Sequence, residues 1–351
     1  MIAMPLIANR YEPTGNAAWG GMGEVNECVD KNLSRKVMLK RVLKTADIPR
    51  LIDEQKALIK LRSKHVVQLL DVVSFTWKTQ TITCLVLEHI EGNDLDKLTF
   101  KPDGDFQKVL WQIASGLSDI HGARVIHRDI KPQNIRKDKF GIIKIFDFGL
   151  AREVGLDDKT KSITGTIGYM APELYGTSTI SFSPAVDAYA FGRTALALLG
   201  QNPPQDRPRK VDPGAVLAKF SSLNPAIAKL IEACLELIPT SRPTMAEVAE
   251  VLGRDLVRNR HRARIVQDGQ TVYELHSKNR AANITSTVGK ITIQYDGTTF
   301  LISAISGSVF INNKKVTSGA QMLSSCVITI GDKGSSRAFL TFDVSNPEIA
   351  A

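Results

Sequence analysis

The fold of this chain is decided by eight consecutive residues, His127-Arg128-Asp129-Ile130-Lys131-Pro132-Gln133-Asn134. They bring a carboxylate, a fixed positive charge and a neutral amide close together, directly after the apolar pair Val125-Ile126. Pro132 prevents a helix from continuing through the segment, so the pattern predicts a rigid loop that carries these polar groups.

A second acidic loop follows. The strand-like run Ile142-Ile143-Lys144-Ile145 leads into Asp147-Phe148-Gly149, a turn that begins with a carboxylate. Magnesium takes oxygen ligands, keeps several of its waters and often shares phosphate oxygens, so two acids and an amide on neighbouring loops predict a cation site beside a phosphate. Asp129 is then free to take a proton from an incoming hydroxyl.

Three motifs occur in a fixed order along the chain. His127-Arg128-Asp129 with Lys131 and Asn134, then Asp147-Phe148-Gly149, then Ala171-Pro172-Glu173 together resemble the signature set of the protein kinases. The resemblance implies an α+β, bilobal kinase fold, with a β-rich N-lobe and a helical C-lobe. It also implies transfer of the ATP γ-phosphoryl group to serine or threonine hydroxyls of protein substrates, with Mg²⁺ as the metal and Mn²⁺ as an alternative.

The same resemblance gives each polar residue of the two loops a role. Asp129 would orient and deprotonate the substrate hydroxyl, and Lys131 would lie near the transferring group. Asn134 and Asp147 would hold the metal ion. Asp187 would accept hydrogen bonds from the backbone of the catalytic loop, and Glu173 would form an ion pair with Arg242.

Composition sets wide limits on the class of protein. The 351 residues are 43% hydrophobic and 23% charged, which is ordinary for a globular chain. The four cysteines form no CxxC pair, so no zinc site or disulfide framework is indicated and a reducing compartment fits best. The most apolar window, residues 185–200, contains Asp187 and Arg193 and is too short to cross a bilayer. We therefore expect a cytoplasmic protein with no membrane span.

The net charge of +9 raises the question of an anionic partner. Nucleic acid, an anionic membrane or an acidic protein would each suit a basic surface. No basic stretch is interleaved with aromatic residues, so a mildly basic surface without a dedicated polyanion partner is favoured and nucleic acid is not expected.

A glycine-rich turn lies near the N-terminus. It resembles the loop with which kinases cover phosphates, with Ala18 where the first glycine is usual and Gly20 and Gly23 at the second and third positions. The residues expected to contact the nucleotide here are Ala18, Gly20, Gly21, Met22, Gly23 and Val25. A dinucleotide fold needs a helix after the third glycine, whereas strand-like residues follow here.

Lys40 ends an apolar strand, where a lysine is more often solvated. The resemblance instead implies that Lys40 reaches the nucleotide phosphates and pairs with a glutamate of the next helix. Residues 49–61 have the apolar spacing of an amphipathic helix. Glu54 is the predicted partner, because Leu58 lies one turn further on and faces the core, whereas Asp53 points about 100° away.

The segment after residue 83 resembles the hinge between kinase lobes. Leu87 falls at the gatekeeper position, the backbone of Glu88 and Ile90 would bond the adenine edge, and Asp94 would accept from the ribose. Arg136 falls where the family places an apolar residue under the adenine. Either its aliphatic stem forms the floor, with a cation–π contact to the base, or nucleotide binding is altered; the first is favoured.

Residues 147–173 resemble an activation loop. Thr160, Ser162 and Thr164 are candidates for phosphorylation, and Arg128 could pair with an added phosphate and order the loop. Thr166 lies where serine/threonine kinases keep a threonine that contacts the catalytic acid and lysine, and with Lys131 it favours serine or threonine substrates.

The chain is expected to form two domains. Residues 1–253 would be the kinase domain, with an N-lobe of about residues 1–88 and a C-lobe of about residues 91–253. Residues 254–265 form an arginine-rich linker, for which a solvated connection is favoured over a docking surface. From residue 266 to 351 the hydrophobic period is two, with hairpin turns, which predicts a small all-β sandwich.

The second half of the predicted sandwich resembles a forkhead-associated domain, a phosphothreonine-binding module. The resemblance rests on residues 309–313 and 327–331. The first half lacks the Gly-Arg and Ser-x-x-His groups that hold phosphate, so a generic sandwich that docks a phosphoprotein or another partner remains an alternative.

Two other functions are alternatives. A pseudokinase scaffold acting through the β domain is the main alternative, but every metal, base and lysine position is filled. A small-molecule phosphotransferase is disfavoured, because Lys131-Pro132 and residues 166–173 suit a peptide. The sequence of residues 20–25 resembles the corresponding sequence in bacterial kinases of the eukaryotic-like (Hanks) type.

Overall fold

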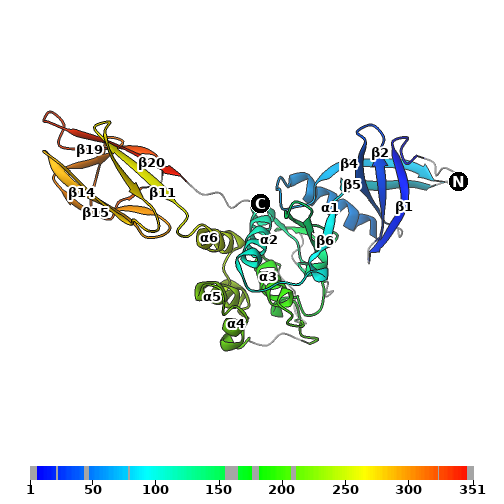
Figure 1. Ribbon diagram of the computed structural model, residues 1–351. Coiled ribbons are helices and arrows are strands. Elements are labelled where there is room, and N and C mark those ends of the chain that lie inside the picture. Colours follow the sequence, from blue (N-terminus) through cyan, green and yellow to red (C-terminus); the bar gives the residue numbers. More distant parts are fainter. Residues whose placement is uncertain are drawn as a thin grey trace. The chain divides into compact units, whose positions relative to one another are not determined.

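The computed structural model of the chain describes residues 6–20, 23–42, 47–77, 80–154, 165–175, 182–206, 211–322 and 324–345. These residues form two compact units, divided in the sequence between Leu252 and Gly253 (Figure 1). Each unit has its own buried apolar side chains.

The N-terminal unit begins with a five-stranded antiparallel sheet in the order β1-β2-β3-β5-β4. Its strands are β1 (Tyr11–Gly20), β2 (Gly23–Asp30), β3 (Arg35–Arg41), β4 (Leu69–Trp77) and β5 (Gln80–Glu88). The central strand β3 buries Val37, Leu39 and Lys40. A lysine at this strand end is therefore inside the molecule and needs a partner.

Helix α1 (Ile48–Lys60) is inserted between β3 and β4 (Figure 1). A proline in its first turn suits the start of a helix, where no N–H partner is needed. Leu51, Glu54, Ala57 and Leu58 form the buried face, at the spacing of one side of a helix. Glu54 therefore projects into the protein from an otherwise apolar stripe.

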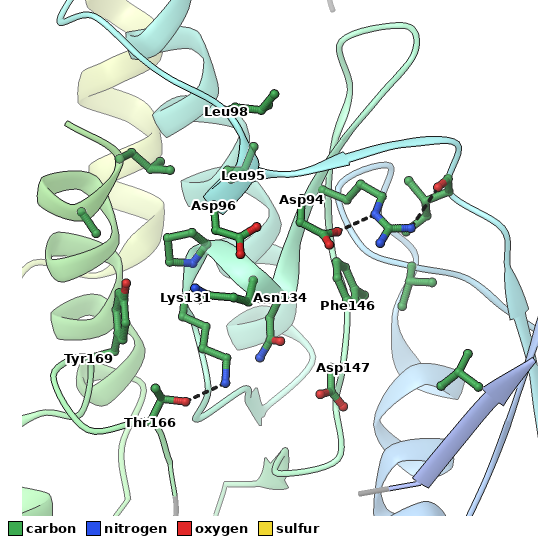
Figure 2. Close-up of a pocket in the computed structure, with 18 of the residues that line it drawn as sticks. Asp94, Leu95, Asp96, Leu98, Lys131, Asn134, Phe146, Asp147, Thr166 and Tyr169 are labelled. Carbon is green, nitrogen blue, oxygen red and sulfur yellow. Dashed lines mark hydrogen bonds and ion pairs between the residues drawn. The ribbon is translucent and has the colours of Figure 1, made fainter. Parts of the chain in front are cut away.

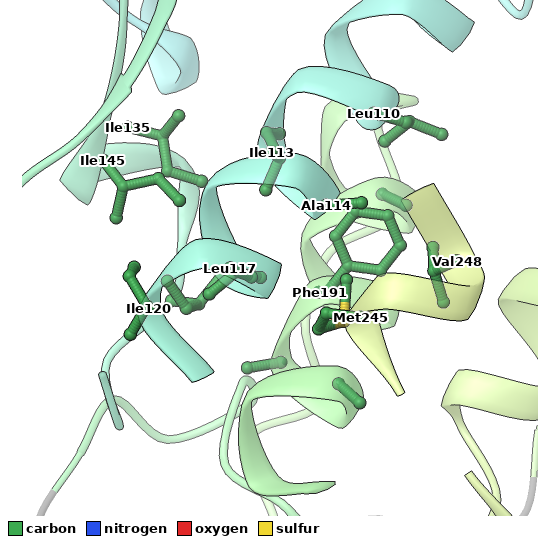
Figure 3. Packing of buried hydrophobic residues seen from close by; sticks show 14 of the residues in the cluster. Leu110, Ile113, Ala114, Leu117, Ile120, Ile135, Ile145, Phe191, Met245 and Val248 are labelled. Atoms are coloured by element: carbon green, nitrogen blue, oxygen red, sulfur yellow. The ribbon is translucent and has the colours of Figure 1, made fainter. Parts of the chain in front are cut away.

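The rest of the N-terminal unit is mainly helical. Its helices are α2 (Gly104–Gly122), α3 (Ala185–Leu198), α4 (Pro213–Lys219), α5 (Pro225–Cys234) and α6 (Met245–Leu256). Asp103 caps α2 by accepting a hydrogen bond from the backbone N–H of Phe106. Figure 3 shows Leu110, Ile113 and Leu117 of α2 beside Phe191 of α3. This packing makes α2 and α3 the rigid base of the unit.

Short elements carry the polar loops on this base. The segments β6 (Gly92–Asp94), β8 (Ile135–Asp138) and β9 (Ile143–Ile145) form a three-stranded sheet, β7 (Val125–Ile126) pairs with β10 (Arg152–Glu153), and the 3₁₀ turns are η2 (Leu95–Lys97), η3 (Pro132–Asn134), η4 (Pro172–Tyr175) and η5 (Pro239–Ser241). The loop 127–131 lies between β7 and η3, and residues 146–149 follow β9.

From residue 262 onward, the helices and strands that the structure describes are all strands, and they form two sheets. One sheet has the order β12-β11-β20-β19-β16-β17 and the other the order β13-β14-β15-β18. The strands are β11 (Arg262–Gln267), β12 (Thr271–Leu275), β13 (Ala281–Ser286), β14 (Gly289–Tyr295), β15 (Phe300–Ser306), β16 (Val309–Ile311), β17 (Lys314–Val316), β18 (Gln321–Met322), β19 (Cys326–Ile330) and β20 (Ala338–Ser345). Buried residues from both sheets form one hydrophobic cluster.

The structure corrects the extent of the predicted linker, residues 254–265. Helix α6 continues to Leu256 and β11 begins at Arg262, so residues 257–261 connect the two elements. In β11, Ala263 and Ile265 are buried while the arginines before each of them point outward. The period of two was hidden in the sequence because its first inward residue is a small alanine between two arginines.

Within the described residues, no helix combines the length and the hydropathy needed to cross a membrane.

Phe191 provides a test of the α2–α3 packing. We expect Phe191→Ala to lower the free energy of unfolding of the N-terminal unit by about 3–5 kcal/mol, because a fully buried ring leaves a cavity. Phe140→Ala is the matched control, since that ring is 72% exposed, and should change the same quantity by less than about 0.5 kcal/mol. All three tryptophans precede Leu252, so urea denaturation followed by tryptophan fluorescence reports on this unit. Equal effects of the two substitutions would contradict the packing.

Candidate functional site

A cavity of about 880 Å³ lies between the N-terminal sheet and the polar loops. Its apolar wall includes Val25, Met38 and Leu87 from the sheet. Figure 2 shows the opposite side, where Asn134 lies between Lys131 and Asp147. The cavity therefore has an apolar part for a flat ring and a polar part for charged groups.

Lys40 joins two carboxylates at the polar end. Its Nζ lies 2.8 Å from Glu54 Oε2 and 2.7 Å from Asp147 Oδ1. The lysine comes from β3, Glu54 from α1 and Asp147 from the loop after β9, so three separate elements meet at one ammonium. Asp53, the neighbouring acid of α1, instead pairs with Arg152 at 2.9 Å on a more exposed surface.

Burial and charge act in opposite directions on this group. Burial raises the pKa of Glu54, and the attraction of Lys40 only partly offsets it, so that pKa lies above its usual value. Burial also raises the pKa of Asp147, but there the Lys40 ammonium outweighs it and the pKa lies below normal. Burial lowers the pKa of Lys40, yet the two carboxylates hold it above its usual value. Lys40 therefore remains a cation.

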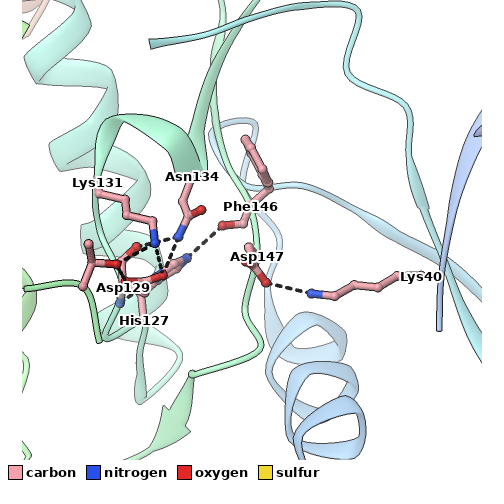
Figure 4. Close-up of polar contacts among 8 residues, drawn as sticks. Lys40, His127, Asp129, Lys131, Asn134, Phe146 and Asp147 are labelled. Atoms are coloured by element: carbon pink, nitrogen blue, oxygen red, sulfur yellow. Dashed lines mark hydrogen bonds and ion pairs between the residues drawn. The ribbon is translucent and has the colours of Figure 1, made fainter. Parts of the chain in front are cut away.

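A second polar group surrounds Asp129 (Figure 4). Its carboxylate accepts hydrogen bonds from Thr166 Oγ1 at 2.7 Å, Lys131 Nζ at 2.8 Å and Asn134 Nδ2 at 2.8 Å. Lys131 also donates to Thr166 Oγ1 at 2.6 Å. Because Asn134 Nδ2 is engaged, its Oδ1 is the atom left to act as an acceptor.

Asp187 of α3 bonds the backbone of the loop that carries Asp129. The Asp187 carboxylate accepts from the backbone N–H groups of His127 and Arg128, both at 2.8 Å, and from His121 Nε2 at 2.9 Å. Arg128 has φ +70°, a backbone conformation that costs free energy for a residue with a side chain. The predicted contact of Asp187 with the catalytic-loop backbone is confirmed.

The loop after β9 is fixed in a similar way. Asp147 has φ +64°, which turns its carboxylate towards the cavity. Phe148 is fully buried and packs edge-on against His127, with 4.7 Å between the ring centres. His127 Nε2 donates to the carbonyl of Phe146 at 3.1 Å. The two loops are thus joined through one histidine.

Arg136 lines the cavity and forms contacts that the sequence interpretation did not include. Its Nε donates to Asp94 Oδ1 at 2.6 Å, and its Nη1 donates to the carbonyl of Ile90 at 3.2 Å. Its guanidinium carbon lies 5.3 Å from the ring centre of Phe146. The sequence analysis missed this ion pair. Asp94 and Arg136 are directly opposite in the β6–β8 ladder, and that register is what would have indicated it.

The other predicted nucleotide contacts are divided between described and undescribed residues. Ala18 pairs with Val25 and Gly20 with Gly23 in the β1–β2 ladder. The predicted contacts Gly21 and Met22 lie outside the described residues. Leu87, Glu88 and Ile90 line the cavity from the end of β5 onward.

Arg128 is a buried cation. Its guanidinium carbon lies 3.7 Å from the ring centre of Phe182, and its Nε has no hydrogen-bond partner within the described part of the chain. Burial and, to a smaller extent, the nearby charge of Arg152 lower the pKa of Arg128 to about 10, although the Asp187 carboxylate partly opposes them. The predicted phosphorylation sites Thr160, Ser162 and Thr164 lie outside the described residues.

The end of the same segment is tied to the helical part. Glu173 accepts two hydrogen bonds from the Arg242 guanidinium, both at 2.8 Å, and the Arg242 side chain is fully buried. Such a two-pronged contact orients both planar groups. The predicted ion pair between Glu173 and Arg242 is confirmed.

Comparison with known proteins gives a family for this geometry. Residues 14–252 match the family model of the protein kinase domain. The chain is 32% identical over 191 residues to G protein-coupled receptor kinase 4 of Rattus norvegicus, covering 51% of this chain and 32% of the relative. It is 35% identical over 192 residues to cyclin-dependent kinase-like 2 of Pongo abelii, covering 52% of this chain and 38% of the relative. The chain spans about a third of the length of these curated relatives.

Removing Lys40 would test the balance of charges at the polar end. In Lys40→Met, Glu54 loses its cation and its pKa should rise further, so ionised Glu54 becomes unfavourable in the folded state. Because the folded protein then holds the proton more tightly than the unfolded chain, stability falls as pH rises. We expect a loss of about 3–5 kcal/mol at a pH of about 8 and a smaller loss at a pH of about 5.5.

The control for this experiment is Lys36→Met. Lys36 pairs with Glu27 at 3.0 Å but its side chain is 56% exposed, so its removal should cost less than about 1 kcal/mol. The pKa of Glu27 lies below its usual value, so no trend is expected in the same pH range. Equal losses at both pH values for Lys40→Met would contradict the assigned pairing.

Proposed function

The chain belongs to the protein kinase family, and we propose that it transfers the γ-phosphoryl group of ATP to serine and threonine hydroxyls of protein substrates. The observation that carries the proposal is the environment of the Asp129 carboxylate. A hydroxyl, an ammonium and an amide all donate to it within 2.8 Å. Its Oδ1 accepts only the bond from Thr166 among these three, and Lys131, Asn134 and Thr166 line a cavity large enough for a nucleotide.

Asp129 would accept the proton of the attacking hydroxyl. The Thr166 hydroxyl already donates to Asp129 Oδ1 at 2.7 Å, so the carboxylate is oriented to receive such a bond. Lys131, 2.8 Å from the other carboxylate oxygen, would place positive charge where the transferring group carries negative charge. Proximity and charge stabilisation are the main sources of rate in this reaction.

Thr166 supports the assignment of the acceptor as serine or threonine. It bonds both Asp129 and Lys131, so it closes the space beside the base with a small side chain. A short aliphatic hydroxyl would reach Asp129 across this space more readily than a phenol ring. Analysis of the phosphoamino acids formed on a mixed peptide substrate distinguishes these acceptors.

The metal would be Mg²⁺, held by Asp147 and by Asn134 Oδ1. Within the described parts of the chain no group of three or more histidine, cysteine or acidic residues forms a closed metal site. Two protein oxygens at an open cavity fit an ion that keeps waters and takes phosphate oxygens. The bound ion would neutralise the phosphate charge. The Lys40 ammonium, 2.7 Å from Asp147, would hold the neighbouring phosphates.

We also propose that phosphorylation of the activation loop regulates the enzyme. Arg128 is buried with an unpartnered Nε, and Arg152 is close enough to lower its pKa. A dianionic phosphate near a buried arginine adds charge-assisted hydrogen bonds. Thr160, Ser162 and Thr164 are the proposed acceptors, in keeping with autophosphorylation.

The C-terminal unit is proposed to be a docking module that resembles a forkhead-associated domain. Two sheets around one core support a sandwich, with kinase residues 1–253 and sandwich residues 266–351 as the proposed domains. The alternative is a pseudokinase scaffold that acts through this unit. The bacterial origin of the kinase also remains a proposal.

Asp129→Asn tests the catalytic proposal. Loss of the base should lower phosphate transfer by at least about a hundredfold, while ATP still binds, because the substituted group does not contact the adenine pocket. Asp105→Asn is the control, since Asp105 is an exposed acid in the first turn of α2, and should retain activity. Transfer of radiolabelled phosphate and calorimetric titration of ATP separate the two effects. Near-normal transfer by Asp129→Asn would refute the assignment, and no transfer by the unsubstituted protein would favour the scaffold.

Mass spectrometry tests the regulatory proposal. We expect phosphate on residues 160–164 of the active protein and none there in Asp129→Asn produced alone. Replacing Thr160, Ser162 and Thr164 together by alanine should lower activity by about tenfold, because the buried Arg128 then gains no phosphate partner. Active protein without phosphate on this loop would contradict the proposal.

A further inference from the structure

The mouth of the nucleotide cavity contains an ion pair that changes how a sugar can be recognised. Asp94 is the carboxylate expected to accept hydrogen bonds from the ribose, and Asp94 and Arg136 both line the cavity. Their Oδ1 and Nε atoms are only 2.6 Å apart. The pairing holds the acceptor before any nucleotide enters.

Each carboxylate oxygen of Asp94 is in contact with a cationic side chain. Arg136 bonds Oδ1, and Lys97 Nζ lies 3.2 Å from Oδ2. The side chains of Asp94 and Arg136 are 15% and 28% exposed, whereas that of Lys97 is 65% exposed. Arg136 is therefore the partner that is held and partly desolvated, and Lys97 is a mobile surface charge that water screens.

Arg136 is itself held at three points. Its backbone lies opposite Asp94 in the β6–β8 ladder, its Nη1 donates to the carbonyl of Ile90 at 3.2 Å, and its guanidinium lies over the ring of Phe146. In Figure 2 the Asp94 carboxylate lies near the Phe146 ring. A side chain fixed in this way does not leave the carboxylate without losing several contacts.

A ribose hydroxyl would have to compete with this guanidinium. A hydrogen bond between a cation and a carboxylate is stronger than one between a neutral hydroxyl and the same carboxylate. Replacing the guanidinium–carboxylate bond by a bond from a ribose hydroxyl therefore brings no net gain in binding free energy. Resting on the proposed function, we propose that Arg136 masks Asp94 from the ribose, so that the kinase uses ATP and deoxy-ATP with nearly equal efficiency, and that Arg136 is the residue that determines this tolerance.

The measurement is kcat/KM with ATP, 2′-deoxy-ATP and 3′-deoxy-ATP in the full chain. We expect the unsubstituted kinase to discriminate between them by less than about threefold. Arg136→Leu exposes Asp94, so the ratio in favour of ATP should rise to about tenfold, mainly through a lower KM for ATP, as expected for a hydrogen bond to a charged group. Adding Asp94→Asn to Arg136→Leu should return the ratio to its original value.

Lys137→Leu is the matched control. Lys137 is the next residue of β8, so its side chain points to the opposite face of the strand, and the ratio should not change. Arg136→Met keeps a long, flexible side chain without the charge. We expect it to give the same nucleotide ratio as Arg136→Leu, and it can replace that variant if Arg136→Leu folds poorly. Tryptophan fluorescence confirms the fold of each variant.

Two results would overturn the inference. One is strong discrimination against deoxy-ATP by the unsubstituted kinase, which would mean that Asp94 accepts from the ribose despite Arg136. The other is an equal loss of efficiency with all three nucleotides in Arg136→Leu and Arg136→Met, which would mean that Arg136 supports the base. Calorimetric titration of ATP separates these results from failure of the proposed function, because a chain that binds none of the nucleotides would reject that function itself.

Discussion

The Asp187 carboxylate is fully buried, and the geometry of the catalytic loop depends on its three hydrogen bonds. An ionised carboxylate inside a protein is costly unless every lone pair is used. Here burial raises the pKa of Asp187, but the hydrogen bond and charge of His121, with the charge and backbone N–H of His127, hold it below normal. Two of the three bonds to this carboxylate come from the loop, and the third comes from His121 of α2. The same bonds offset the strain of the positive φ at Arg128.

Two charge groups are built on that support and kept separate across one cavity. Asp129 is surrounded by donors, whereas Asp147 shares the Lys40 ammonium with Glu54. The first arrangement suits proton transfer from a hydroxyl, and the second suits a metal and phosphates. Burial raises the pKa of Glu54 and opposes the charge of Lys40, whereas the two carboxylates keep Lys40 charged. Movement of α1 away from the sheet would therefore break the Lys40–Glu54 contact.

Arg136 shows how one substitution in a family pattern changes a site without changing its fold. The β6–β8 pairing and the cavity are both present, but Asp94, the proposed sugar acceptor, is paired with an arginine of the opposite strand. Cross-strand pairs lie close enough for charges to interact, whatever their separation in the sequence. The proposed effect on nucleotide choice rests on this local pairing of charges.

Three features could be predicted from the amino-acid sequence alone: the order of the kinase motifs, Glu54 and not Asp53 as the partner of Lys40, and the change to a hydrophobic period of two after the kinase unit. Motif spacing and hydrophobic periodicity are local properties of a chain, so they can be read without the fold. The sequence did not reveal the Arg136–Asp94 pair, the position of Arg128 over Phe182 or the start of β11. The first two join residues 42 and 54 positions apart (136 − 94 and 182 − 128), and the third is an alternation masked by exposed arginines. Only the tertiary structure decides such contacts, because strand register and helix packing bring distant side chains together and determine which charges lose their water.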